Sequence, residues 1–302
     1  MTEKDYKKML KNKLILYRDM LNLPPDVTFG LEIEYEGILK DTVSHILYEE
    51  QLDKKLIGWK NKSEFSIALY TEDNEIINGE INSPILKDTK EAWEDLKYLL
   101  ELLKNHGAFI SSKCGGHVNI GAHIFENNFE YIKNFILSWV LYEKEIRRFS
   151  SGEYKKLRID IDGLFKSVGE VVEPEILLKS SKNFILFDEL WGLFDKNHSI
   201  YIKQPICNKF MFGNVIEFRI PNGTLSEEIW QNYINFFVRF ILACKKEMDQ
   251  EKIVYKINNQ EHNSIELADF VFDNDLDKEQ FLIQTLNTNK IYSKTLIPHK
   301  YF

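Results

Sequence analysis

The stretch from Phe29 to Gly37 constrains the fold most strongly, because it alternates strictly between two kinds of side chain. One set is apolar and comprises Phe29, Leu31, Ile33 and Tyr35. The other set is acidic and comprises Glu32, Glu34 and Glu36. Period-two alternation is typical of a strand with one buried face. Like charges on one face of a sheet destabilise it, so we interpret the acidic face as the place where a divalent cation binds.

Three later segments repeat this design, with apolar side chains on one face and polar or charged side chains on the other. Their polar members are Glu80 and Asn82, His117 and Asn119, and Glu217 and Arg219. Any one of these pairs, taken singly, is more often a solvated surface group than a site. Their agreement across four segments favours one polar sheet face that binds a ligand. Oxygen ligands with at most one imidazole favour Mg²⁺ or Mn²⁺ over zinc.

This arrangement of residues predicts metal-dependent phosphoryl transfer from a nucleotide. Clustered carboxylates could hold two or three ions, which clamp phosphoryl oxygens during displacement. Arg219, two residues from Glu217, could neutralise charge on the transferred group. The chain has no P-loop, Gly-x-Gly-x-x-Gly, His-Glu-x-x-His or Gly-x-Ser-x-Gly motif. Cys114 is a weak candidate nucleophile, since we expect its side chain and that of His117 on opposite strand faces.

Composition excludes several classes of partner. The net charge of -8 and pI of about 5.5 argue against nucleic acid. No apolar run is long enough to span a membrane, and Met1–Lys13 lacks the apolar core of a signal peptide. Three cysteines without CxxC spacing predict a reducing, cytoplasmic location. The oligomeric state stays open.

We expect one catalytic domain over residues 1–302, with a motif core at 29–225 and a helical flank at 226–302. Expected helices cover Asp5–Leu21, Thr42–Leu52, Lys90–Asn105, Asn128–Phe149, Glu173–Lys179, Phe184–Leu193, Glu227–Met248, Ser264–Phe272 and Lys278–Leu286. Their expected caps are Asp41, Asp88 and Ser226, with Gly107 as a stop. Beyond Phe29–Gly37, expected strands cover Phe65–Tyr70, Ile76–Ile85, Ala108–Ser111, Gly116–Gly121 and Asn214–Pro221.

Four motifs, in order over about residues 29–225, resemble the amidoligase family of glutamine synthetase-like carboxylate-amine ligases. They are Phe-Gly-Leu-Glu-Ile-Glu, Gly-Glu-Ile-Asn-Ser-Pro-Ile-Leu, Gly-Gly-His-Val-Asn-Ile-Gly and Ile-Glu-Phe-Arg-Ile-Pro-Asn-Gly-Thr. The resemblance implies an α+β fold with a curved, mainly antiparallel and partly barrel-like sheet. It also implies that the concave face binds metal and ATP, with helices packed outside.

The resemblance further implies an activity. ATP phosphorylates a carboxylate, small or peptidic, and an amine then attacks the acyl phosphate to give an amide. The implied metal ligands, with Mg²⁺ or Mn²⁺, are Glu32, Glu34, Glu80, His117 and Glu217. Arg219 becomes the phosphate-stabilising catalytic group, next to Glu217, and Glu36 lies outside the usual Glu-x-Glu.

Two residues are further candidates for contact with the nucleotide. Asn119 stands where the family often has a second His, and its amide can still bond a nucleotide or substrate. Arg148 ends a helix, where a cation is favourable in any case, and phosphate contact is its alternative role. An acid that the family often carries is missing around Trp59–Ser63, which bears on substrate recognition. A small-molecule kinase and a degenerate nucleotide- or partner-binding module are the competing functions.

Overall fold

The computed structural model describes residues 2–64, 67, 75–111, 113–126, 128–152, 167–170, 172–179, 199–203 and 215–287. Within these residues the fold is α+β, with an open six-stranded sheet in the order β2-β3-β1-β4-β6-β5. The strands are β1 Phe29–Glu36, β2 Lys60–Lys62, β3 Asn78–Asn82, β4 Gly116–Gly121, β5 Ile200–Lys203 and β6 Val215–Phe218. Every neighbouring pair is antiparallel, which confirms the expected α+β class and strand direction.

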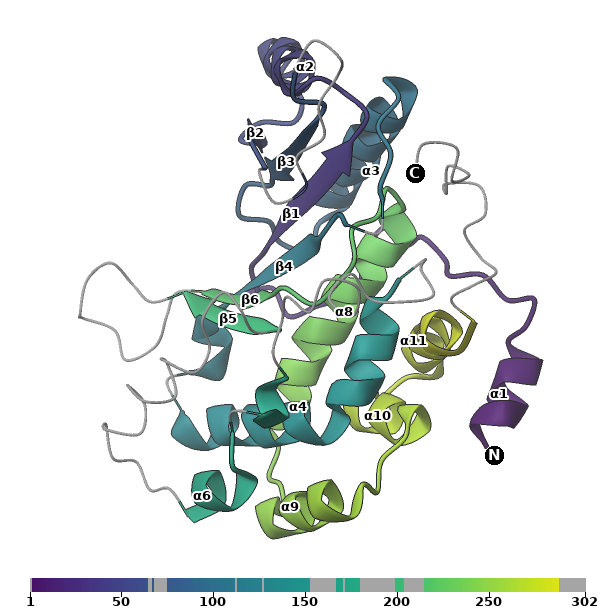
Figure 1. The fold of residues 1–302 in the computed structure, drawn as a ribbon, viewed down its shortest axis with the longest axis vertical. Helices are drawn as coiled ribbons and strands as arrows, with labels where there is room; N and C mark the ends of the chain where they lie inside the picture. Colours follow the sequence, from purple (N-terminus) through teal and green to yellow (C-terminus); the bar gives the residue numbers. More distant parts are fainter. Residues whose placement is uncertain are drawn as a thin grey trace.

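Nine α-helices and two short 3-10 helices are present in the described part of the chain. The α-helices are α1 Glu3–Met9, α2 Lys40–Leu52, α3 Lys90–Asn105, α4 Phe129–Ser150, α6 Pro174–Lys179, α8 Glu227–Cys244, α9 Gln250–Asn259, α10 Ser264–Val271 and α11 Asp275–Asn287. The 3-10 helices are η1 Ala122–Phe125 and η2 Val168–Glu170. Figure 1 shows α4 and α8 next to each other, with α6 and α9 at the bottom. None of the described helices is long and apolar enough to cross a bilayer.

Strand register decides which side chains meet. Glu32 lies opposite His117, Glu34 opposite Glu80, and Asn119 opposite Glu217. Residues directly opposite each other in an antiparallel pair point to the same face. The polar members of four separate sequence segments therefore gather on one face of the sheet.

The other face of the sheet is the main hydrophobic core. Trp93 of α3 stacks on Phe29 with ring centroids 5.4 Å apart. Phe237 of α8 stacks on Phe218 at 4.2 Å, and Trp139 of α4 packs against Phe218 at 5.6 Å. Three helices thus pack on the apolar face and hold the strands in place.

The first helix is much shorter than expected, because α1 ends at Met9 rather than near Leu21. The backbone of the segment that follows α1 forms hydrogen bonds to other elements. The N–H groups of Leu16, Arg18 and Leu21 donate to Gln280 (2.6 Å), Gln231 (2.9 Å) and Asp88 (2.9 Å). The guanidinium of Arg18 also lies 2.8 Å from the buried carboxylate of Asp277. Tertiary hydrogen bonds therefore override the helical periodicity of this segment.

Two expected helix caps are wrong. Thr89, not Asp88, caps α3, because its side chain accepts the N–H of Ala92 at 3.3 Å. Asp88 instead accepts the indole N–H of Trp93 at 2.7 Å. Asp41 lies inside the first turn of α2, whose N-cap is Leu39.

Other limits agree in part. β3 is shorter than the expected strand at 76–85, and residues 108–111 form only an isolated bridge between Phe109 and Glu36 instead of a strand. β4 and α3 have the expected limits, Ser226 caps α8, and Gly107 follows α3 with φ +91°. α8 ends at Cys244 rather than Met248, while β2, β5 and α9 were not expected. The expected helix at 184–193 lies outside the described residues, as does the strand at 65–70 apart from Ile67, which is in a turn.

Candidate metal centre

His117 lies at the centre of the polar face, surrounded by carboxylates. Its Nδ1 lies 3.0 Å from Glu32 Oε2 and 3.4 Å from Glu217 Oε1. Its Nε2 lies 3.7 Å from Glu34 Oε1. The imidazole is only 3% exposed, and Glu34 and Glu217 are also buried. Strands β1, β4 and β6 each contribute to this cluster, so its geometry is set by the sheet itself.

Two ligand groups share this histidine. Glu32, His117 and Glu217 form the first group, and Glu34, Glu80 and His117 form the second. Within each group, the candidate ligand atoms lie within 4.8 Å of one another. All five metal ligands expected from the sequence are therefore brought together. A donor set of four carboxylates and one imidazole fits Mg²⁺ or Mn²⁺.

Neighbouring groups orient the carboxylates. Gly115 donates its backbone N–H to Glu34 Oε2 at 2.6 Å. The Asn119 amide donates to Glu32 Oε1 at 3.0 Å, and the Asn82 amide donates to Glu80 Oε1 at 2.5 Å. Such outer hydrogen bonds fix ligand orientation in metal sites. The other oxygens of Glu32 and Glu34 face His117, at 3.0 Å and 3.7 Å.

The electrostatics of the face favour a cation. Burial raises the pKa of Glu80, and the negative charge of Glu32 raises it further, although the bond from Asn82 opposes the rise. A raised carboxyl pKa means that the ionised form is penalised by its surroundings. A divalent ion among these oxygens would relieve that penalty, so the residues present fit the ion.

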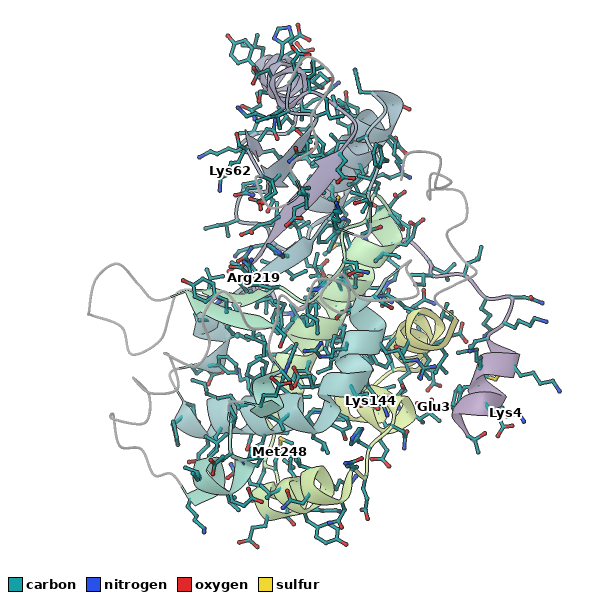
Figure 2. All side chains as sticks on the ribbon, in the orientation of Figure 1. Glu3, Lys4, Lys62, Lys144, Arg219 and Met248 are labelled. Carbon is teal, nitrogen blue, oxygen red and sulfur yellow. The ribbon has the colours of Figure 1, made fainter. Side chains whose placement is uncertain are left out.

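Arg219 lies at the end of β6 and pairs with Glu217 through its guanidinium. Its side chain is 21% exposed, so it reaches from the buried cluster towards solvent. In Figure 2, Arg219 lies on the same side of the sheet as Lys62. The phosphate-stabilising residue expected from the sequence is thus adjacent to one ligand group.

Arg148 is not part of this cluster. It ends α4, and its guanidinium lies 3.1 Å from the carboxylate of Glu3 on α1. Figure 2 shows Glu3 on the opposite side of the molecule from Arg219. The pair joins α4 to the N-terminal helix, and nothing in this geometry supports the expected contact of Arg148 with a nucleotide.

A hollow of about 340 Å³ adjoins the first ligand group. Glu32 and Asn119 of the sheet are among its lining residues, and so is His123 of η1. Gly30 and Gly121 contribute no side chain to its floor. Asn119, a candidate for nucleotide contact, therefore borders both the carboxylates and a space that opens beside them.

A comparison with protein families identifies the chain. Residues 25–241 match the family described as "putative amidoligase enzyme". The chain belongs to this amidoligase family. The match covers every motif that carries the site, from Glu32 to Arg219. No curated protein matches the chain closely enough to stand as a relative.

The sequence did not point to two lysines that border these candidate ligand groups. Lys60 and Lys62 lie on β2, opposite Asn82 and Glu80. Strand β2 is three residues long, which is too short for alternation to be recognised. The available signal was the charge pattern Lys-Asn-Lys after Trp59.

Glu36, the third acid of β1, is 1% exposed and lies outside both candidate ligand groups. Burial raises its pKa, and the charge of Glu34 adds to the rise, against a hydrogen bond from Ser111 and the charge of Lys113. Cys114 beside it is fully buried, and burial raises the pKa of its thiol well above the ordinary range. The thiol is therefore poorly suited to act as a nucleophile.

Replacing Glu36 with Gln is expected to stabilise the metal-free protein in a pH-dependent way. A carboxyl group whose pKa is raised by folding carries no penalty while it is protonated, and it loses stability as pH rises through the folded pKa. Gln cannot ionise, so Glu36→Gln should unfold at a higher urea concentration than wild type at pH 8. The difference should shrink towards pH 5.

Urea unfolding at both pH values in the presence of a chelator measures this effect. Glu49→Gln, an exposed change on α2, is the control and should show little difference at either pH. Equal midpoints for wild type and Glu36→Gln at pH 8 would contradict the burial penalty.

Proposed function

We propose that the chain is an ATP- and Mg²⁺- or Mn²⁺-dependent ligase that joins a carboxylate to an amine through an acyl phosphate. The observation that carries the proposal is the pair of ligand groups sharing His117 on one sheet face of an amidoligase. Two neighbouring ion positions suit chemistry in which phosphoryl oxygens must be neutralised and held.

The reaction has two balanced steps. A carboxylate oxygen of the substrate bonds to the terminal phosphorus of ATP while the bond to the ADP oxygen breaks. The amine nitrogen then bonds to the acyl carbon, and inorganic phosphate leaves. Bound divalent ions would supply the charge neutralisation that the phosphoryl oxygens need.

The protein's own residues hold and orient the reactants. Glu32 and Glu217 would hold one ion with His117, and Glu34 and Glu80 would hold the other. Arg219 lies beside Glu217, so its guanidinium can offset negative charge on the transferred group. We assign the hollow lined by Asn119 to the nucleotide, because it opens directly from the first ligand group.

The test is product analysis with purified protein, MgATP and panels of carboxylates and amines. ADP release should depend on both co-substrates, and mass spectrometry should detect an amide. Glu34→Ala is expected to lower turnover by at least about tenfold, since even residues that only support a metal ligand contribute that much. Glu49→Ala, exposed on α2, is the control that should retain turnover.

The other outcomes separate the competing functions. A phosphorylated product without amide would overturn the ligase proposal in favour of a kinase on the same site. Intact ATP with every substrate pair would favour a binding module. Full turnover of Glu34→Ala would show that the second ligand group has no part in the reaction.

A further inference from the structure

Two lysines border the ligand face on the β2 side of the sheet. Register pairs Lys60 with Asn82 and Lys62 with Glu80, so both lysines point towards the face that carries the carboxylates. The Lys62 ammonium donates to Asn82 Oδ1, and the Asn82 amide in turn donates to Glu80 Oε1 at 2.5 Å. The Lys62 charge is thus connected to the second ligand group through one neutral side chain.

Among the described residues, neither lysine pairs with an acid. In the part of the chain that the structure describes, Lys60 and Lys62 form no ion pair, and the bond that Lys62 makes is to an amide. Elsewhere on the surface, Lys256 and Lys278 each lie 2.9 Å from a carboxylate. Two exposed ammonium groups beside an acidic cluster are therefore available to an anion from solution.

An edge-protection role is the main alternative. Lysines on an edge strand hinder pairing with another sheet, and β2 is at the edge of the described sheet. Edge protection needs charged side chains on the edge strand, but it does not require them to point to one particular face of the sheet. Lys62 instead turns inward over β3 and bonds Asn82, which favours recognition of something bound above the ligand residues.

We propose that Lys60 and Lys62 bind a second anionic group of the carboxylate substrate. This inference rests on the proposed function, and it identifies the substrate as a dicarboxylate or a carboxylate that carries another oxyanion. Strands lie about 4.8 Å apart, and β2 is two strands from β1. A reacting carboxylate over Glu34 and Glu80 would therefore place the second anion roughly 5–10 Å away, a span that a short aliphatic chain covers.

Hydroxylamine trapping tests the inference without knowledge of the natural amine, because it converts an acyl phosphate to a hydroxamate. The probes are glutarate and pentanoate, which have equal chain length and differ in the second carboxylate. Wild type should convert glutarate with a kcat/KM at least about tenfold higher, as charge-assisted hydrogen bonds imply. Lys60→Gln/Lys62→Gln should lose that preference, with unchanged conversion of pentanoate and unchanged KM for ATP.

The control is Lys87→Gln/Lys144→Gln, which removes the same charge at exposed positions outside the ligand face. Figure 2 shows Lys144 beside the lower helices, far from Lys62. This variant should keep the preference for glutarate. Thermal melts should show that both double variants are folded.

Each remaining outcome is decisive. Equal conversion of the two probes by wild type would overturn the inference while leaving the ligase proposal intact. A rise in KM for ATP in Lys60→Gln/Lys62→Gln, without loss of the glutarate preference, would assign the lysines to nucleotide phosphate instead. If neither probe forms a hydroxamate, the panel of carboxylates and amines described above decides the ligase proposal. Calorimetry with Mn²⁺ then still decides the inference, because glutarate must bind more tightly than pentanoate to wild type only.

Discussion

His117→Ala is expected to abolish tight divalent-ion binding and to lower MgATP-dependent turnover by at least about 100-fold. The imidazole belongs to both ligand groups, so its loss removes a ligand from each. A residue that only supports a metal ligand contributes about 10–100-fold, and a shared ligand should contribute more. The variant also leaves Glu32, Glu34 and Glu217 without the group that lies between them.

Calorimetric titration with Mn²⁺ measures the binding, and ADP release measures turnover. His45→Ala is the matched control, because this histidine is exposed on α2 and pairs only with a surface glutamate. It should bind Mn²⁺ as wild type does. Tight Mn²⁺ binding by a folded His117→Ala protein would refute the shared centre, and circular dichroism establishes whether the variant is folded.

Phe218→Ala is expected to lower the free energy of unfolding by about 3–5 kcal/mol, the usual effect of truncating a buried aromatic side chain. Phe218 stacks on Phe237 at 4.2 Å and packs against Trp139. It also lies between Glu217 and Arg219 in the sequence, with its ring on the opposite face. The cavity left under β6 should therefore displace the two site residues that the strand presents, and Mn²⁺ affinity should fall as well.

Phe281→Ala is the control that separates the loss of stability from the loss of Mn²⁺ affinity. Phe281 is as deeply buried as Phe218, but it belongs to α11 and packs against Phe149 and Phe236. Urea unfolding should give comparable losses for both variants, while Mn²⁺ affinity measured below each transition should fall only for Phe218→Ala. An unchanged affinity in Phe218→Ala would mean that β6 holds its site residues without help from the core.

The sequence predicted the faces of the strands better than the limits of the helices, and the reason is physical. Alternation on a strand is a local property, so Glu32, His117 and Glu217 could each be assigned a face from their neighbours. Register is not local, and only the structure shows that Glu32 faces His117 and that one imidazole serves two ligand groups. Lys62 was missed because its strand is too short to alternate visibly.

The errors in helix limits also arise from long-range contacts, which a local sequence pattern does not show. Aspartate is a common helix cap, and Asp88 precedes α3. In the structure, however, its carboxylate accepts hydrogen bonds from the indole of Trp93 and from two backbone N–H groups of the segment after α1. That segment has helical spacing of apolar residues, yet Gln231 and Gln280 satisfy its backbone from distant helices. A local sequence pattern carries no information about hydrogen-bond partners more than 200 residues away.

The attachment of this N-terminal segment to the C-terminal helices affects folding during synthesis. Arg18 and its partner Asp277 are 259 residues apart, and a ribosome adds about 5–20 residues each second. Arg18 is therefore made roughly 13–50 s before Asp277. Leu21 and Leu23 find their partner Asp88 early in that interval, whereas Leu16 and Arg18 must wait for α8 and α11. Leu16 and Arg18 are thus made long before the residues that hold them in place.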